Sequence, residues 1–342
     1  MATFDLSIIV CGMHLEPAFG DTYKEIEKVG FNIRAKVDCI CDDTLEAMVK
    51  RNGYELHMFA EILKEIQPDV LLLEGDRGEA LMGAIAAKYQ NICVAHQGGG
   101  VLTGSIDDRI RDAITAFADI HFAGSLRSLE RLKVLARNAN CVYFTGEPGV
   151  EAVMKTRVEP KEELFYRYGL RPGEPLILVV QHPVTTEVND AHLQITETME
   201  AIKMIGLQTL VILPNSDAGA RTMISEVHQY ETLGFLKTMA SVPHEDYVNL
   251  LRYCEVLIGN SSSGIIEAPV LSKPFINVGT RQRGRERAGN VVDVPYDAIS
   301  ILTAFHHVRS SADFRRRCLE TPSPYGGGNT SERIVEILSG KC

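Results

Sequence analysis

The sequence lacks any apolar run of the roughly 18 residues that a membrane-spanning helix needs. Its opening residues, MATFDLSIIV, carry an acidic side chain at Asp5 and too short an apolar stretch for a secretory signal peptide. We therefore expect a protein of the cytoplasm that has no membrane partner.

An excess of positive charge is also missing. Lys and Arg number 35 against 45 Asp and Glu, which gives a formal net charge of -10. Because surfaces that bind nucleic acid are typically basic, this composition disfavours a nucleic-acid partner. A local cluster of arginines remains compatible with a small phosphate-bearing ligand.

The cysteines form no C-x-x-C pair and no regular framework. Cys39 and Cys41 stand two residues apart, but no His or Cys pair follows them at the spacing of a zinc site. The pattern predicts reduced, mostly buried thiols rather than disulfides. The eight are Cys11, Cys39, Cys41, Cys93, Cys141, Cys254, Cys318 and Cys342.

The common cofactor motifs are absent as well. The sequence has no Walker A motif, no strand that leads into G-x-G-x-x-G, no H-E-x-x-H and no Asp-rich cluster. We therefore expect neither a redox cofactor nor a catalytic metal.

What the chain does contain is 342 residues, enough for two domains of roughly 100 to 200 residues each. Short apolar runs alternate with stretches of helical period, which is typical of βα units on a parallel sheet. The segment Arg171-Pro172-Gly173 is the best linker candidate between two such series. The predicted fold class is α/β, with two Rossmann-like doubly wound domains facing across a cleft.

The predicted domain boundaries follow from these series. We expect an N-terminal domain over 1–168, a nucleotide-binding domain over 169–325, and a C-terminal helix over 326–342 that packs back on the N-terminal domain. Strands are expected over 6–10, 70–73, 92–95, 120–123, 141–144, 176–180, 209–213, 256–258 and 274–278. Helices are expected over 43–66, 191–205, 219–231, 244–253, 264–271 and 330–338.

Ligands of such folds bind outside the carboxyl ends of the strands, so the loops there should carry the chemistry. After strand 70–73 the sequence EGDR places Asp76 and Arg77 in a turn. Asp76 could abstract a proton or orient a hydroxyl, but it could equally cap the following helix.

Strand 92–95 runs into His96, Gln97 and three consecutive glycines. His96 could act as an acid, a base or a hydrogen-bond donor, or it could be a loop histidine bonded to nearby carbonyl groups. Farther on, Asp107 and Asp108 begin a helix. One of these carboxylates can cap the helix while the other points toward a ligand.

In the second series, strand 176–180 ends in QHPVTT, where the following proline favours an extended backbone at His182. Strand 209–213 ends in PNSDAG, in which Asn215 and Asp217 offer amide and carboxylate groups to sugar hydroxyls. Taken alone, that loop is also explained by ordinary turn chemistry.

The loop GNSSSGIIE, residues 259–267, follows strand 256–258 and leads into a helix. Backbone N–H groups and hydroxyls at Ser261, Ser262 and Gly264 predict an anion site, and Glu267 can reach a ribose diol. The loop GTRQRGRER that follows holds four arginines, of which Arg281 is the first. Guanidinium geometry favours a diphosphate clamp there over a solvated run of charge.

These loops, in this order, resemble the hydrolysing UDP-N-acetylglucosamine 2-epimerases, both the bacterial sialic-acid-pathway enzymes and the epimerase half of the animal bifunctional enzyme. The resemblance extends from about Ile8 to the C-terminal helix. It includes GMHLEPAFGDTYKEIE, EGDR, TGSIDDRIRDAIT, QHPVTTE, PNSDAG, GNSSSGIIEAP, INVGTRQRGRE and YGGGNTSERI. It implies a GT-B-like architecture, no metal or NAD, and a homodimer or homotetramer.

The resemblance also implies a reaction and its residues. UDP would leave the sugar by elimination to a 2-acetamidoglucal, and addition of water would then release N-acetylmannosamine. By matching motif, Asp76 and Asp107 correspond to catalytic carboxylates, Arg77 lies beside the sugar, and His96 belongs to the catalytic set. The matching substrate contacts are His182, Asn215, Asp217, Ser261, Ser262, Gly264, Glu267 and Arg281.

The chain departs from the family pattern in two ways. The family's loop after the third strand typically reads His-Ile-Glu-Gly-Gly-Glu or His-Ile-His-Gly-Gly-Glu, and in ungapped register Gly98 replaces the acidic or imidazole residue. The activity could then be weaker, altered in substrate, or rebuilt from Glu74 or His96. In addition, Met1 lies only a few residues before the family's second strand, so the first βα unit is expected to be lacking.

Two alternatives to the hydrolysing epimerase stay open. One is a nucleotide-sugar-binding homologue that has lost turnover, and the other is a GT-B glycosyltransferase. The loops do not identify the sugar substituents at C4 or C6, so a related diacetamido sugar is an equal candidate substrate.

Overall fold

The computed structural model describes residues 4–38 and 42–340. The chain divides into two compact units, which we call the N-terminal unit (Met1–Glu151 with Tyr325–Cys342) and the C-terminal unit (Ala152–Pro324). The chain leaves the N-terminal unit at Glu151, before the sequence-based boundary at 168, and Arg171–Gly173 lies inside the C-terminal unit.

The N-terminal unit holds two parallel sheets. In the smaller sheet, β1 (Ile8–Cys11) pairs with β2 (Ile33–Val37). The larger sheet has the order β3-β4-β5-β6, made of Val70–Glu74, Cys93–Gln97, Ile120–Ala123 and Val142–Phe144. Among the described residues the two sheets share no backbone ladder.

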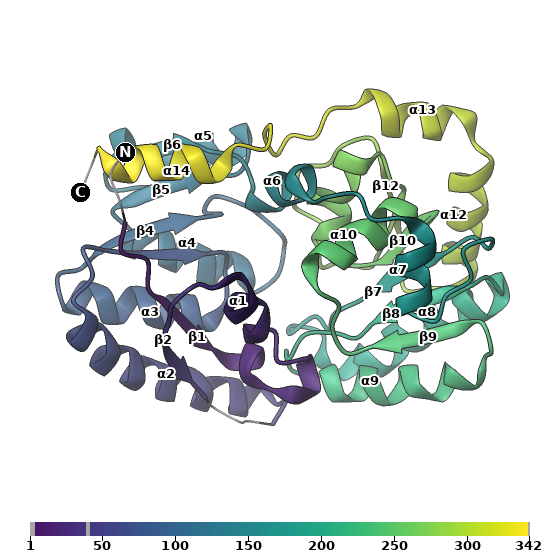
Figure 1. Cartoon of the computed structure of the whole chain (residues 1–342), viewed down its shortest axis with the longest axis horizontal. Coiled ribbons are helices and arrows are strands. Elements are labelled where there is room, and N and C mark those ends of the chain that lie inside the picture. The colour runs from purple at the N-terminus through teal and green to yellow at the C-terminus, as the bar shows by residue number, and fades with distance from the viewer. Residues whose placement is uncertain (1–3, 39–41, 341–342) are drawn as a thin grey trace. The chain divides into compact units, whose positions relative to one another are not determined.

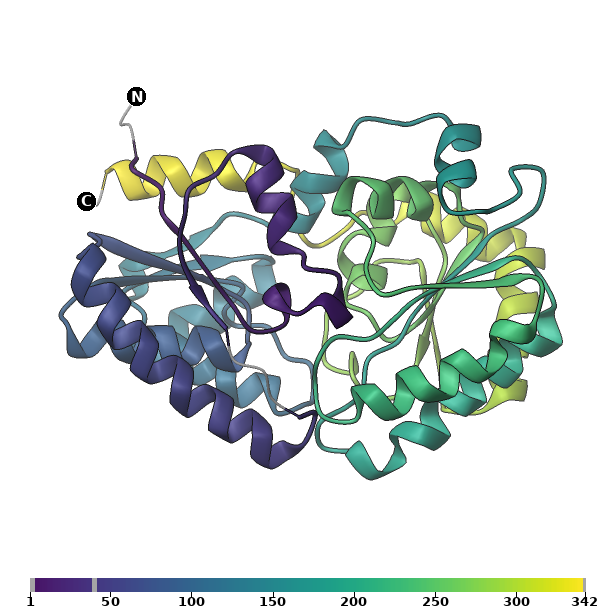
Figure 2. The same cartoon turned by 60° about the horizontal axis from the view of Figure 1, so that its bottom comes forward.

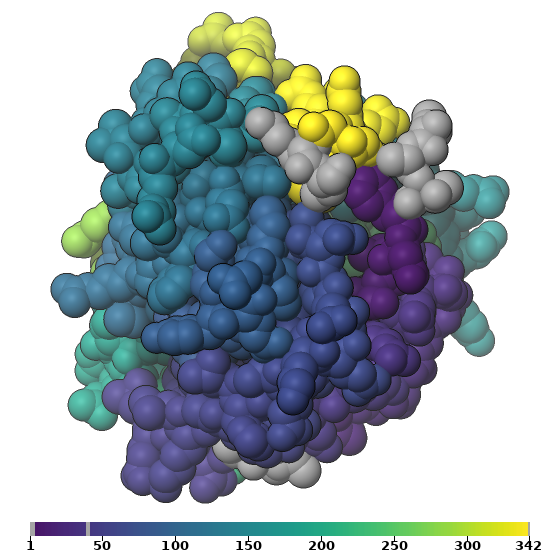
Figure 3. Space-filling view, turned by 90° about the vertical axis from the view of Figure 1, so that its left-hand side faces the viewer, coloured from purple at the N-terminus to yellow at the C-terminus, as the bar shows by residue number. Residues whose placement is uncertain are grey.

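Helices join these sheets into one core. Apolar residues of β1, β2, β3 and β4 pack against α2 (Leu45–Ile66) and α3 (Gly78–Tyr89), and Figure 2 shows α2 running along the outside of this unit. On β4 and β5, α14 (Thr330–Ser339) packs through Ile334 and Leu338. The start of the described chain and α14 lie on the same side of the unit (Figures 1 and 3). Its other helices are α1 (Tyr23–Val29), α4 (Asp107–Phe117) and α5 (Leu126–Leu135), with α6 (Pro148–Lys155) at the boundary.

The C-terminal unit is built on one parallel sheet of order β12-β11-β10-β7-β8-β9. From β7 (Ile177–Val180) the chain proceeds outward through β8 (Thr209–Ile212) to β9 (Leu236–Met239). It then returns to β10 (Val256–Gly259) on the other side of β7 and continues outward. The strand order therefore reverses between β7 and β10, the position where doubly wound folds bind ligands. The remaining strands are β11 (Phe275–Val278) and β12 (Val291–Val294).

Buried apolar side chains of this sheet pack against α8 (Ala191–Ile205), α9 (Ala220–Gln229) and α12 (Ala298–Ser310). The unit also contains α7 (Lys161–Arg167), α10 (His244–Tyr253) and α13 (Ala312–Glu320). With the parallel sheets of the N-terminal unit, it confirms the predicted α/β class in two compact units.

The predicted helix over 264–271 is wrong as one continuous helix. The structure has one α-helical turn, α11 (Ser263–Ile266), followed by a 3-10 turn over Ala268–Leu271. Pro269 stands in the first positions of that second turn and lacks the N–H that would continue an α-helical ladder.

Three strands that the apolar pattern does not predict are β2, β9 and β12. All three form sheet edges, where exposed residues such as Arg34, Lys36 and Asp293 interrupt the apolar run.

The described cysteines, Cys11, Cys93, Cys141, Cys254 and Cys318, all carry free thiols. Cys39, Cys41 and Cys342 lie outside the described residues. Across the described ranges, no helix combines the length and apolar character needed to cross a membrane.

Candidate active site

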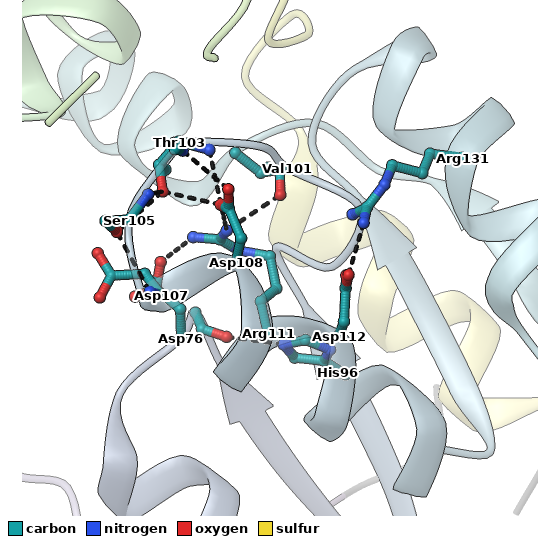
Figure 4. A network of polar contacts seen from close by, with 12 residues as sticks. Asp76, His96, Val101, Thr103, Ser105, Asp107, Asp108, Arg111, Asp112 and Arg131 are labelled. Atoms are coloured by element: carbon teal, nitrogen blue, oxygen red, sulfur yellow. Dashed lines mark hydrogen bonds and ion pairs between the residues drawn. The ribbon is translucent and has the colours of Figure 1, made fainter. Parts of the chain in front are cut away.

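Asp76, in the turn after β3, is held by a buried arginine (Figure 4). Arg111, on α4, is 1% exposed and donates from Nη2 to Asp76 Oδ2. Its Nη1 donates to the carbonyl oxygen of Val101 at 3.0 Å and to Asp108 Oδ1 at 3.1 Å. A buried guanidinium with this set of acceptors keeps the Asp76 carboxylate in one orientation.

Asp107 and Asp108, at the start of α4, differ in their hydrogen bonds. Asp108 Oδ1 accepts from Thr103 N–H at 2.6 Å and from Thr103 Oγ1 at 2.8 Å, and its Oδ2 accepts from Gly104 N–H at 2.8 Å. The Asp107 carboxylate has no hydrogen bond or ion pair among the described residues, and Figure 4 shows it directed away from Arg111. Asp108 thus organises the loop, and Asp107 keeps an unengaged, half-buried carboxylate.

His96 is fully buried at the end of β4. Its Nε2 lies 2.8 Å from the Gly75 carbonyl oxygen, which can only accept, so Nε2 carries the proton. Its Nδ1 lies 3.4 Å from Thr115 Oγ1. Burial lowers the pKa of His96 to about 4. The structure therefore places a neutral His96 beneath the Gly75 turn, with both ring nitrogens engaged.

Gly98 stands directly beside that turn with φ +83°. A Cβ atom built on Gly98 would lie 3.6 Å from Gly75 N and 3.7 Å from Gly75 Cα. The side chain that the family pattern places here would thus begin next to the backbone that carries Asp76.

Arg77 lies close to two acidic side chains, Glu79 and Glu55. Arg77 Nε donates to Glu79 Oε1 at 3.3 Å, and Glu79 Oε2 is buried with no partner in the described chain. Nearby on α2, Glu55 is 0% exposed and neither of its oxygens has a described partner. Both carboxylates approach Gly12, since a Cβ built there would lie 3.5 Å from Glu79 Oε1 and 3.9 Å from Glu55 Oε1. Burial, and next the Glu79 carboxylate, raise the pKa of Glu55 to about 7.

In the C-terminal unit, His182 follows β7. Its Nδ1 accepts from the Asn215 backbone N–H at 3.1 Å, so the neutral ring carries its proton on Nε2. Asn215 Nδ2 donates to Asp217 Oδ2 at 2.7 Å. The loops after β7 and β8 thus meet at these side chains.

The loop over 259–267 that follows β10, which we call the serine loop, contacts side chains of α10. Ser263 Oγ forms a short hydrogen bond with Tyr247, and Ser263 N–H donates to Ser261 Oγ at 3.3 Å. Glu267 Oε1 lies 3.2 Å from His244 Nε2. Because α11 is only one turn long, serine hydroxyls and loop N–H groups are the donors this segment offers to an anion.

The loop over 279–287, which we call the arginine loop, contains arginine side chains with different contacts. Arg281 Nη1 donates to the Asn260 carbonyl at 3.3 Å. Arg287 contacts Asp293 and donates to the Gln282 carbonyl at 2.8 Å. Arg283 is exposed. Arg287 therefore braces the loop, and Arg281 lies against the end of β10.

Comparison with known proteins assigns this arrangement of loops to a family. The family model described as UDP-N-acetylglucosamine 2-epimerase matches residues 1–339. The chain belongs to this family.

Two relatives illustrate the range of that epimerase family. A UDP-N,N'-diacetylbacillosamine 2-epimerase (hydrolyzing) from Legionella pneumophila is 33% identical over 98% of this chain and 88% of its own length. A UDP-N-acetylglucosamine 2-epimerase from Neisseria meningitidis serogroup B is 29% identical over 98% of this chain and 87% of its own. The family thus includes hydrolysing enzymes.

A solved structure of the family has the same fold. The UDP-GlcNAc 2-epimerase from Neisseria meningitidis bound to UDP-GlcNAc superposes with a TM-score of 0.79 at 17% identity, covering 98% of this chain and 99% of that one.

The sequence alone did not identify several residues that lie close to these epimerase loops. Arg111 was not identified because the sequence does not distinguish a buried arginine from an exposed one. The pair Glu55 and Glu79 was not identified, although Glu55 lies four residues before Phe59 on the buried face of α2, because charged side chains are usually assigned to the exposed face. Asn260 was quoted within its loop without a role of its own. No group of three His, Cys, Asp or Glu residues suited to a metal ion occurs in the part of the chain that the structure describes.

Proposed function

We propose that this chain is a hydrolysing 2-epimerase that converts UDP-N-acetylglucosamine, or a related nucleotide-activated 2-acetamido sugar, to UDP and the free manno sugar. The observation that carries the proposal is the contrast between Asp76, held by Arg111, and Asp107, whose carboxylate is unengaged at the start of α4. The similarity to the UDP-N,N'-diacetylbacillosamine 2-epimerase (hydrolyzing) from Legionella pneumophila supports it.

In the proposed elimination, Asp107 takes the proton from C2 as the bond between C1 and the diphosphate oxygen breaks. A C1–C2 double bond forms, and UDP departs. Water then adds its oxygen to C1, and C2 receives a proton on the opposite face. Asp76, oriented by Arg111, would hold a sugar hydroxyl or the acetamido N–H. We assign His96 to holding the Gly75 turn rather than to proton transfer.

The leaving diphosphate would be stabilised by the C-terminal unit. His182 offers an Nε2–H donor, Ser261 and Ser262 offer hydroxyl and N–H donors, and Arg281 offers a guanidinium. Glu267 would accept from the ribose hydroxyls. Asn215 would contact sugar or phosphate oxygens beside His182, and Asp217 would accept from a sugar hydroxyl. Arg77 would lie beside the sugar, with its guanidinium held by Glu79.

The absence of a side chain at Gly98 favours one competing candidate, a homologue that binds the nucleotide sugar with little turnover. A single assay separates the candidates. The purified protein is incubated with UDP-N-acetylglucosamine in D2O while UDP release and the sugar are followed by NMR. We expect UDP and N-acetylmannosamine that carries deuterium at C2. UDP-N-acetylmannosamine would instead indicate a non-hydrolysing epimerase, and binding without UDP release would indicate the binding homologue.

The nucleotide end of the proposal has its own test. Arg281→Ala should weaken UDP binding about 10- to 100-fold, as measured by calorimetry, because charge-assisted contacts to phosphate are lost. Arg283→Ala, which removes the same charge from an exposed position in the same loop, should change the affinity less than twofold. An unchanged affinity in Arg281→Ala would contradict the diphosphate assignment.

We also propose that the activity resides in the cytoplasm in a homodimer or homotetramer. The free thiols of the described cysteines favour a reducing compartment.

A further inference from the structure

Asn260 lies at the carboxyl end of β10, next to the point where the strand order of the C-terminal unit reverses. The parallel ladder of β7 and β10 ends with Gly259 opposite Val180, and the Asn260 N–H donates to the Val180 carbonyl at 3.1 Å. Beyond this bond the two strands turn into their loops. The residue after the ladder therefore decides how the two loops leave the sheet.

The Asn260 side chain continues the ladder where the backbone cannot. Its Oδ1 accepts from the His182 N–H at 2.7 Å, and its Nδ2 donates to the His182 carbonyl at 2.8 Å. Asn260 is 0% exposed, so both bonds are shielded from water. An amide is needed here because only a group with both an acceptor and a donor can match a backbone N–H and C=O together.

The Asn260 carbonyl joins a third segment to the same point. It accepts from Gln282 Nε2 at 2.9 Å and from Arg281 Nη1 at 3.3 Å. Gln282 is 1% exposed, so the start of the arginine loop is anchored from within the unit. One residue thus contacts both the backbone of His182 and the side chain of Arg281.

The hydrogen bonds from Asn260 to the His182 backbone also affect the position of the His182 ring. With the His182 backbone fixed at N–H and C=O, the ring places Nδ1 3.1 Å from the Asn215 N–H, so the proton of the neutral ring is on Nε2. A loosened backbone would release both the position and the tautomer of that ring.

We infer that Asn260 is a positioning residue that aligns His182 and Arg281 as joint donors to the diphosphate of a nucleoside diphosphate. The inference rests on the proposed function for the identity of the ligand. Asn260 itself touches no phosphate. Its contribution is to hold two donors, from loops about 100 residues apart in sequence, in one arrangement.

The test compares Asn260→Ala and Asn260→Asp with a matched control, Asn249→Ala. Asn249 is 2% exposed, and its side chain likewise accepts from a backbone N–H, that of Glu159, and donates to a backbone carbonyl, that of Arg157. UDP affinity is measured by calorimetry on the full chain. We expect both Asn260 variants to lose at least tenfold in affinity. The UDP affinity of Asn249→Ala should stay within twofold of the wild-type affinity, even if this variant loses as much thermal stability as the Asn260 variants.

A spectroscopic measurement tests the positioning role without relying on turnover. Nitrogen-15 NMR of labelled protein, with His182→Gln to assign the ring, should show one His182 tautomer protonated on Nε2 in wild type. Asn260→Ala should show a mixture of tautomers, and Asn249→Ala should match wild type. Folded Asn260 variants with wild-type UDP affinity, or with an unchanged His182 ring, would overturn the inference. Wild-type protein that fails to bind UDP would refute the proposed function instead, and the NMR comparison would still decide whether Asn260 positions His182.

Discussion

Two neighbouring carboxylates, Asp107 and Asp108, are almost identical in sequence context and differ completely in surroundings. Asp108 accepts hydrogen bonds from Thr103, Gly104 and Arg111, whereas Asp107 accepts none from the described residues. A carboxylate with four such bonds has little remaining capacity to accept a substrate proton. A carboxylate without them can exchange protons and can change its orientation.

We predict that Asp107→Asn lowers kcat by about 100- to 10,000-fold while leaving thermal stability nearly unchanged, because only proton transfer is lost. Asp108→Asn should instead lower the free energy of unfolding by about 1 to 3 kcal/mol through lost loop hydrogen bonds. Steady-state kinetics and thermal melts of both variants check this contrast. Loss of stability in Asp107→Asn, with kcat retained, would assign the two carboxylates the other way round.

Glu55 illustrates how burial changes a carboxyl group's effect on stability. Its pKa in the folded chain is about 7, above the ordinary value of 4.5. Between those pH values the folded state binds more protons than the unfolded state, so stability falls as pH rises through this window.

We therefore predict that Glu55→Gln weakens the loss of stability between pH 5 and pH 8, because glutamine has no proton to lose. At pH 8 the variant should be more stable than wild type by about 3 kcal/mol, the order expected for a shift of this size. Urea unfolding at several pH values measures it. Glu61→Gln, on the same helix with a side chain 66% exposed, serves as control and should follow the wild-type curve. Parallel curves for wild type and Glu55→Gln would refute the prediction.

At the scale of elements, the turn from β10 into the serine loop depends on one glycine. Gly259 has φ +134°, and a Cβ built there would lie 2.1 Å from the Val180 carbonyl oxygen. No side chain fits between these two strand ends without moving one of them. The close approach is what brings Asn260 within hydrogen-bond distance of His182.

Gly259→Ala should thus lower the free energy of unfolding by more than about 2 kcal/mol and weaken UDP binding as well, since it combines steric overlap with an unfavourable φ. Gly173→Ala, in the same unit at a position with open space, should change stability by less than about 0.5 kcal/mol. Chemical denaturation and calorimetry of both variants provide the measurement. A stable Gly259→Ala that binds UDP normally would show that the strand ends can separate at little cost.

Much of this level of structure is predictable from the sequence. Central strands are short, mainly apolar runs because both faces are covered. Ile120–Ala123, in which His121 is the one polar residue, was predicted at the observed residues. Other central strands, such as Ile177–Val180, were predicted to within one or two residues. Edge strands such as Ile33–Val37 were not predicted, because their exposed positions are polar. Loop motifs predicted which segments carry chemistry. They could not predict that His96 would be buried or that Asn260 would bond to a residue 78 positions away, since both depend on tertiary packing.

At the scale of the whole molecule, the two units differ in how the chain forms them. The C-terminal unit is one continuous segment, whereas the N-terminal unit consists of two segments, the second of which is Tyr325–Cys342. Within that unit, Ser331 N–H donates to Glu151 Oε2 at 2.6 Å, and α14 covers β4 and β5. Packing of the N-terminal core is therefore complete only when the last described helix is in place.

The division of the N-terminal unit into two sheets has a consequence for local unfolding. Since β1 and β2 share no ladder with β3, they can open together without breaking the four-stranded sheet. Native-state hydrogen exchange should show amides of Ile33–Val37 exchanging through an opening of lower free energy than amides of Cys93–Gln97. Equal protection of both strands would indicate a single cooperative unit. Each such opening would carry Gly12 away from Glu55 and Glu79 and admit water to the buried oxygens there, both of Glu55 and Oε2 of Glu79.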